Sequence, residues 1–132
     1  MDWTLALYVA LGGAIGSVAR YALTVLIQSR QLSPFPTATL VINVTGSLLL
    51  GFLARYFAES MASAELRLLL MTGFCGGYTT FSTFSYETMR LVEDGDYRRA
   101  TLYATSSVVL SLAATFGGFA LARAALAARR MT

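Results

Sequence analysis

The sequence predicts an all-α integral membrane protein with four transmembrane helices in a single domain covering residues 1–132. Hydrophobic residues make up 56% of the chain and charged residues 13%, whereas soluble domains carry about 25% charged residues. Four apolar stretches are each long enough to cross a hydrocarbon core of roughly 30 Å. The first stretch lacks the basic leader of a signal peptide, so we expect it to be retained as a span.

The first predicted span, about residues 3–28, combines small residues with an arginine. Gly12 and Gly16 form a small-xxx-small pattern that lets membrane helices approach closely. Arg20 lies about eight residues, or roughly 12 Å, from the end of the helix. An arginine at that depth indicates a functional site, although a snorkelling or structural arginine is the alternative.

The second predicted span, about residues 37–57, carries one polar stripe on an apolar helix. Thr39, Asn43 and either Gly46 or Ser47 recur at helical spacing. The Asn43 amide needs hydrogen-bond partners at membrane depth. Contacts between helices would satisfy it, and so would a binding site.

The third predicted span, about residues 66–91, is expected to break in mid-membrane near residues 76–80. Gly76 and Gly77 each cost a helix about 1 kcal/mol relative to alanine. The threonines and serines that follow compete with the helical hydrogen bonds through their hydroxyls. Backbone groups freed in a membrane survive only where protein or water satisfies them, so the break is a candidate ion site.

Phe81 and Phe84 follow the predicted break at a spacing of three residues, which places them on one helix face if the helix resumes there. The edges of aromatic rings carry partial positive charge. The pair could therefore favour an anion that meets the ring edges, and packing in the core is the alternative.

The fourth predicted span, about residues 97–124, carries Tyr103, Ser107 and Ser111 at a spacing of four. Their hydroxyls therefore share one helix face. Intramembrane carboxylates are typical of proton and cation transport. Glu87 is the one candidate, but it lies about a turn from the end of the third span, where we expect a vestibule-facing or solvated position. The deep polar groups are otherwise neutral donors, which suit a small anion.

The basic residues are ten arginines and no lysine, with no basic run that would indicate a nucleic-acid partner. Four spans place both termini on one side of the membrane. That side holds Arg55, Arg67, Arg123, Arg129 and Arg130, and the other side holds Arg30, Arg90, Arg98 and Arg99. Orientation follows the excess of basic residues in short loops, and five against four is hardly an excess. We therefore predict insertion in both orientations and an antiparallel, dual-topology homodimer.

The residue types exclude several other functions. With one cysteine and no histidine, the chain has no intrachain disulfide, no usual zinc site and no histidine-based triad. Cys75 also lacks a basic partner that would activate it. We predict that the protein is not an enzyme.

Three motifs together resemble the Fluc/CrcB family of bacterial fluoride channels, and the resemblance covers essentially the whole chain. They are GFCGGYTTFSTF at residues 73–84, Gly12-Gly13-x-x-Gly16-x-x-x-Arg20-Tyr21, and Asn43-x-x-Gly46. One departure is Ala38, where the family often has glycine. The resemblance implies a multi-pass, dual-topology homodimer in the bacterial cytoplasmic membrane, with two pathways at the dimer interface that export fluoride passively and relieve its toxicity.

The same resemblance implies a role for each candidate site residue. Phe81 and Phe84 would offer ring edges to fluoride, Asn43 would hydrogen-bond the ion, and Tyr103, Ser107 and Ser111, with Thr39 and Thr83, would form a polar track. The backbone carbonyls of Gly76 and Thr79 from both copies would bind one central structural sodium ion. Arg20 matches an arginine of the family's first span and could belong to an anion vestibule.

Two other functions are consistent with a four-span chain of this size. A small multidrug-type exporter needs a carboxylate embedded in its first span, and this span has no acidic residue from Thr4 onward. A membrane scaffold would use the glycines and hydroxyls only to join helices, and it predicts no ion flux.

Overall fold

The structure is a computed structural model that describes residues 2–131, and its regular elements are all helical within that range. They are α1 (Trp3–Gln28), α2 (Thr37–Glu59), α3 (Ala64–Arg67), the π-helix η1 (Leu68–Cys75), α4 (Gly76–Tyr78), α5 (Phe81–Glu93) and α6 (Tyr97–Arg129). Among them, α1, α2 and α6 are long and apolar enough to cross a membrane. The third predicted span is divided among the shorter elements from α3 to α5.

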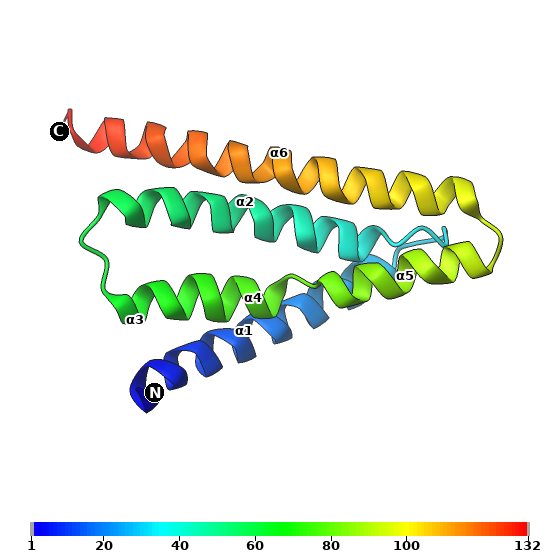
Figure 1. The fold of residues 1–132 in the computed structure, drawn as a ribbon, viewed down its shortest axis with the longest axis horizontal. Helices are drawn as coiled ribbons and strands as arrows, with labels where there is room; N and C mark the ends of the chain where they lie inside the picture. Colours follow the sequence, from blue (N-terminus) through cyan, green and yellow to red (C-terminus); the bar gives the residue numbers. More distant parts are fainter. Residues whose placement is uncertain (1, 132) are drawn as a thin grey trace.

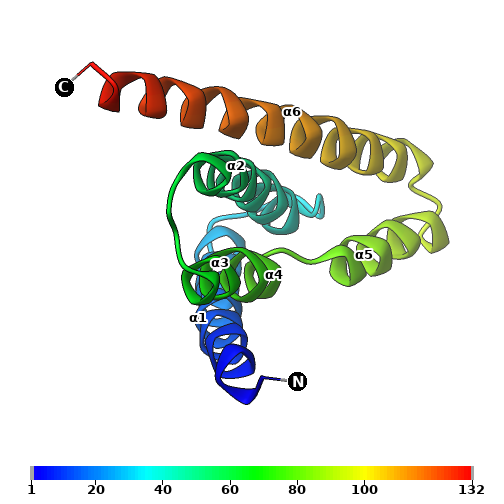
Figure 2. The same cartoon turned by 60° about the vertical axis from the view of Figure 1, so that its left-hand side comes forward.

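The helices lie roughly along one common direction, with α1 crossing the others at an angle (Figure 1). The start of α1, the end of α6 and the connection from α2 to α3 lie at the same end of the molecule. Turning the view shows α6 lying over α2, while α5 diverges from α1 and meets the start of α6 (Figure 2). Segments on the two sides of the α4–α5 link therefore have different neighbours.

Glycines set the contact between α1 and the η1–α4 segment. A Cβ atom on Gly12 would lie 2.0 Å from the carbonyl oxygen of Leu69, and one on Gly16 would lie 2.2 Å from that of Phe74. On the facing segment, a Cβ on Gly77 would lie 2.4 Å from the carbonyl oxygen of Gly13. The backbones touch directly, so the close-packing role predicted for Gly12 and Gly16 is confirmed.

A second glycine contact joins α2 to α6. A Cβ on Gly51 would lie 2.4 Å from the carbonyl oxygen of Thr115, and one on Gly118 would lie 2.3 Å from that of Leu48. The close backbone approach that Gly12 and Gly16 allow at α1 therefore also operates between the second and last long helices.

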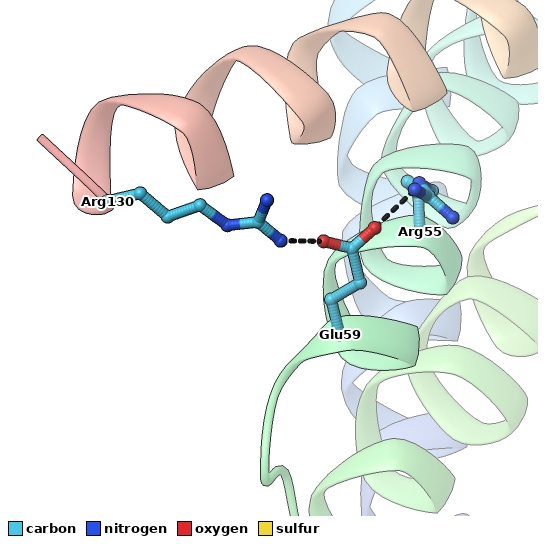
Figure 3. Close-up of polar contacts among 3 residues, drawn as sticks. All are labelled: Arg55, Glu59 and Arg130. Carbon is cyan, nitrogen blue, oxygen red and sulfur yellow. Dashed lines mark hydrogen bonds and ion pairs between the residues drawn. The ribbon is translucent and has the colours of Figure 1, made fainter.

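An ion-pair cluster joins the ends of these two helices (Figure 3). Glu59, the last residue of α2, pairs with Arg55 one turn earlier and, at 3.0 Å, with Arg130 after the end of α6. Arg67 donates to the carbonyl oxygen of Phe57, which lies in the last turn of α2 and has no helical partner there. Arg129 also donates to the Tyr56 hydroxyl, so four arginines of the termini side have partners within the protein.

The backbone leaves the helical conformation at Thr79 and Thr80, after the glycine pair. Gly76 has helical angles (φ −65°, ψ −37°), and the helix continues to Tyr78. Thr79 and Thr80 are extended, with ψ of 160° and 116°, and α5 begins at Phe81. The interruption therefore lies within the predicted range of residues 76–80, at its threonine end. Gly77 itself stays helical and allows the close approach to α1.

Candidate functional site

The side chain of Asn43 holds the extended segment by two hydrogen bonds to one residue. Its Oδ1 accepts from the Thr80 amide at 2.9 Å, and its Nδ2 donates to the Thr80 carbonyl oxygen at 3.0 Å. In a continuous helix the Thr80 amide would donate to Gly76. Asn43 thus replaces the missing helical hydrogen bond, and Nδ2 keeps one further hydrogen for another acceptor.

Other side chains use some of the carbonyls beside this segment. The Thr79 hydroxyl donates to the Cys75 carbonyl oxygen at 2.9 Å, and the Ser17 hydroxyl donates to that of Gly77 at 3.4 Å. In the described part of the chain, no hydrogen bond outside the helices reaches the carbonyl oxygens of Gly76 or Thr79. These two oxygens remain available to a ligand.

The surroundings of Gly76 are open on the side that a Cβ would occupy, with no heavy atom within 4 Å of that position. Unwound backbone carbonyls are a common form of sodium site in membrane proteins. The residues from 2 to 131 contain no group of three or more His, Cys, Asp or Glu side chains that could hold a metal. A cation site here would therefore rely on backbone oxygens.

An open groove of about 350 Å³ lies beside the extended segment, between α2, α5 and α6. Its lining comprises Asn43, Gly46, Ser47, Leu50, Thr79, Thr80, Phe81, Phe84, Ser107, Val108, Ser111 and Leu112. This set, drawn from the described residues, contains no charged side chain. The structure therefore brings five predicted pathway residues together: Asn43, Phe81, Phe84, Ser107 and Ser111.

Aromatic rings and an unpartnered hydroxyl give the groove its chemistry. The rings of Phe81 and Phe84 have centroids 5.5 Å apart at an interplanar angle of 45°, and Phe81 is 78% exposed. Ser107 is only 6% exposed, and its hydroxyl has no hydrogen-bond partner among the described residues. A buried hydroxyl without a partner is costly, so Ser107 is suited to donate to a ligand in the groove.

Glu87 joins three helices through two of the predicted track residues. The Thr39 hydroxyl donates to Oε1 at 3.0 Å, and the Tyr103 hydroxyl donates to Oε2 at 2.7 Å. Tyr103 is fully buried, and its ring centroid lies 5.3 Å from that of Phe84. Glu87 is therefore a half-buried acceptor for hydroxyls from α2 and α6, not a solvated side chain.

A second cavity, of about 510 Å³, lies between the connection from α1 to α2 and the outer part of α5. Thr83, Glu87 and Arg90 are among its lining residues. Thr83 also accepts a hydrogen bond from the Thr80 hydroxyl at 3.0 Å. Arg20 lines neither cavity, and its guanidinium makes no hydrogen bond or ion pair with the residues described.

The predicted polar track is therefore divided between two places. Ser107 and Ser111 face the groove, whereas the hydroxyls of Thr39 and Tyr103 are bonded to Glu87 beside the second cavity. The sequence signal that could have revealed this bridge is the single acidic residue at depth, since one carboxylate can accept from two hydroxyls.

Comparison with known proteins relates nearly the whole chain to one family. The model of the CrcB-like protein family (camphor resistance, CrcB) matches residues 7–119. The chain is 49% identical over 125 residues to the fluoride-specific ion channel FluC of Nitrobacter winogradskyi, covering 93% of this chain and 98% of that protein. It is 48% identical over 119 residues to FluC of Rhizobium meliloti, covering 89% and 95%, and 46% identical over 115 residues to a FluC of Thermus thermophilus, covering 87% and 92%.

Proposed function

Because the chain belongs to the CrcB-like family and is a multi-pass bacterial membrane protein, we propose that it is a fluoride-selective ion channel. Its relatives are named fluoride-specific ion channels, and the similarity covers almost their whole length. The channel conducts fluoride passively out across the cytoplasmic membrane and so relieves fluoride toxicity.

The groove lined by neutral donors and two phenylalanines is the observation that carries this proposal. A small anion entering a membrane loses its hydration and needs hydrogen-bond donors in exchange. The free hydrogen of the Asn43 amide and the unpartnered Ser107 hydroxyl supply such donors. Phe81 and Phe84 add ring edges with partial positive charge, and a site of this kind holds an anion without trapping it.

An antiparallel homodimer would complete the groove. Phe81 is 78% exposed in one protomer although it lines the groove, so a second copy is needed to enclose the ion. The balance of five arginines against four favours insertion in both orientations. Two-fold symmetry then gives two equivalent grooves and two fluoride pathways.

A structural sodium ion at the centre of the dimer would account for the unpartnered carbonyls. Gly76 and Thr79 each offer one carbonyl oxygen, and two copies together would supply four. Hard cations take oxygen ligands of this kind. When bound, the ion would join the two interruptions and place a positive charge between the two pathways.

Fluoride efflux from liposomes, read with an ion-selective electrode and compared with chloride, tests the proposed activity. We expect Phe81→Ile and Phe84→Ile to lower fluoride efflux by roughly a hundredfold or more, the range reached when a key electrostatic contact is removed. Because Phe81 is largely exposed in the protomer, its substitution should leave the protomer folded.

Phe116→Ile is the matched control, since this phenylalanine on α6 is 70% exposed and does not line the groove. It should conduct like the unmodified protein. Normal flux in both groove variants would overturn the aromatic pathway, and the absence of any flux from the unmodified protein would favour the scaffold.

Labelling of tags from the two sides of the membrane tests dual topology. We expect a tag at either terminus to be accessible from both sides, because the basic residues give little bias. A single fixed orientation would exclude the antiparallel dimer while leaving fluoride conduction open.

A further inference from the structure

Tyr78 and Thr45 form a hydroxyl pair directly beside the extended segment, and neither belongs to the proposed fluoride pathway. Their oxygens lie 2.9 Å apart. The Thr45 hydroxyl already donates to the carbonyl oxygen of Val41 at 2.7 Å within its own helix. A hydroxyl has one hydrogen and two acceptor positions, so Tyr78 is the donor and Thr45 the acceptor of this bond.

The ring of Tyr78 is also fixed by packing. It stacks on Phe74, with ring centroids 5.8 Å apart and an interplanar angle of 9°. A Cβ atom on Gly46 would lie 3.1 Å from Cδ1 of Tyr78 and 2.3 Å from Cγ2 of Thr79. Tyr78 and Thr79 therefore pack directly against α2 at Gly46, where any larger residue would clash with them.

One short stretch of α2, residues 43–46, consequently holds the chain on both sides of Thr79. Thr45 holds Tyr78 before it, and Asn43 holds Thr80 after it by two hydrogen bonds. Thr79 is extended and its carbonyl oxygen is unpartnered within the described residues. The direction of that carbonyl is thus set by the two anchored neighbours.

We propose that the Tyr78 hydroxyl is a positioning group for the sodium site, acting through Thr45 to hold the Thr79 carbonyl toward the ion. This inference rests on the proposed function, in which that carbonyl is a sodium ligand. Preorganised ligands bind more tightly because less freedom is lost on binding. A neutral hydrogen bond contributes a factor of roughly 2–12 in an equilibrium constant, and that factor should appear in the apparent sodium affinity.

The test is a sodium titration of the detergent-purified full chain, read by thermal melting and, in liposomes, by fluoride efflux. Tyr78→Phe removes only the hydroxyl and should raise the half-saturating sodium concentration roughly 2–12-fold. Fluoride efflux at saturating sodium should stay within about twofold, since the groove is unchanged. Thr45→Val should give the same shift, and the double variant should shift no further than either single variant.

Tyr21→Phe is the matched control, because Tyr21 is 71% exposed on α1 and its hydroxyl has no partner among the described residues. It should titrate like the unmodified protein. Unchanged sodium titrations in Tyr78→Phe and Thr45→Val would overturn the positioning role alone. A loss of maximal efflux with no change in the half-saturating sodium concentration would overturn it too.

The two proposals can fail separately. If the unmodified protein shows no sodium dependence by either readout, the sodium site fails and the positioning role fails with it. If melting depends on sodium and shifts in the variants while no fluoride flux occurs, the positioning role stands and the channel function fails.

Discussion

The chain is held in two different ways on the two sides of Thr79. Before it, η1 and α4 touch α1 through backbone atoms, with Gly12 and Gly16 facing the carbonyls of Leu69 and Phe74. After it, α5 is joined to α2 and α6 by side chains, chiefly through Glu87. The first kind of contact excludes all extra volume, and the second depends on particular hydrogen-bonding groups.

The difference separates the part of the protein that fixes helix spacing from the part that lines the two cavities. Backbone contact at a glycine fixes the distance between two helices and leaves no room for solvent or ligand. Side-chain contacts leave cavities, and both cavities that contain predicted pathway residues lie on the α5 side. We therefore expect substitutions at the glycine contact before Thr79 to act on folding, and those of the groove phenylalanines after it to act mainly on conduction.

The largest effect should follow from adding a methyl group at the glycine contact. In Gly12→Ala the new Cβ would lie 2.0 Å from the carbonyl oxygen of Leu69, and backbone atoms cannot move aside cheaply. We expect a loss of roughly 3 kcal/mol or more in stability, at the upper end of overpacking effects. Thermal melting and size-exclusion chromatography in detergent would measure it.

Gly13→Ala provides the control on the next position of the same helix. Its Cβ would have nothing nearer than the carbonyl oxygen of Gly73, at 3.8 Å, and alanine favours a helix over glycine by about 1 kcal/mol. We expect equal or slightly higher stability. A similar loss of stability in both variants would show that the loss comes from replacing any glycine of α1, and not from the close contact at Gly12.

The next largest effect should come from Asn43, which binds the extended segment between α4 and α5. Asn43→Ala leaves the amide and carbonyl of buried Thr80 without partners. We expect a cost of roughly 2–6 kcal/mol, at about 1–3 kcal/mol for each unsatisfied group, together with a loss of fluoride efflux. Asn43→Asp keeps the acceptor for the Thr80 amide, so it should lose less stability while still failing to conduct. Equal stability of Asn43→Ala and the unmodified protein would show that the two hydrogen bonds from Asn43 to Thr80 do not stabilise the extended segment.

The sequence was sufficient to predict the helical class, because long apolar stretches between short polar connections leave few alternatives. The close packing of Gly12 and Gly16 was also predictable from their spacing alone. Local spacing determines which face of a helix a residue occupies, and that is enough for a contact made by small residues.

Local sequence predicted an interruption near residues 76–80, but not which of these residues leave the helix. Gly76 and Gly77 are the poorest helix formers in the segment, yet they remain helical, while Thr79 and Thr80 do not. The deciding partner is Asn43, which lies 37 residues from Thr80 in the chain. Likewise, the bond from Thr39 to Glu87 spans 48 residues, so only the assembled fold reveals it.

A smaller effect is expected at the Glu87 bridge. Tyr103→Phe removes one donor from a half-buried carboxylate and should cost about 1.5–3 kcal/mol, the range for hydrogen bonds to charged groups. Thr39→Val should cost less, and the two losses should not add, because both hydroxyls serve the same group. A double-mutant cycle followed by thermal melting measures this coupling.

Thr88→Val is the control for the threonine substitution. Its hydroxyl donates to the Phe84 carbonyl oxygen within α5, at 2.8 Å, and contacts no other helix through that bond. Its stability should stay within about 0.5 kcal/mol of the unmodified protein, as for substitutions away from a shared network. Strictly additive losses at Thr39 and Tyr103 would mean that Glu87 does not couple the helices.

The smallest effect on stability should occur at the ion-pair cluster that joins the ends of α2 and α6 (Figure 3). Arg130 is largely exposed where it meets Glu59, and exposed ion pairs contribute about 0–1 kcal/mol. We expect Arg130→Ala to lower stability by less than about 0.5 kcal/mol, and high salt should remove the difference. Its effect on orientation is a separate matter, since it changes the arginine count of that side from five to four.

Orientation and stability can therefore be separated at this one end of the molecule. Equal counts should keep both orientations populated, so Arg130→Ala should conduct normally. Ala127→Arg combined with Ala128→Arg raises the count on that side from five to seven and should fix one orientation. Such a variant should fold but lose fluoride efflux, because an antiparallel pair requires both orientations. Tag accessibility and efflux measured on the same membranes give the result, and full efflux from a protein with one fixed orientation would show that the groove does not need an inverted copy.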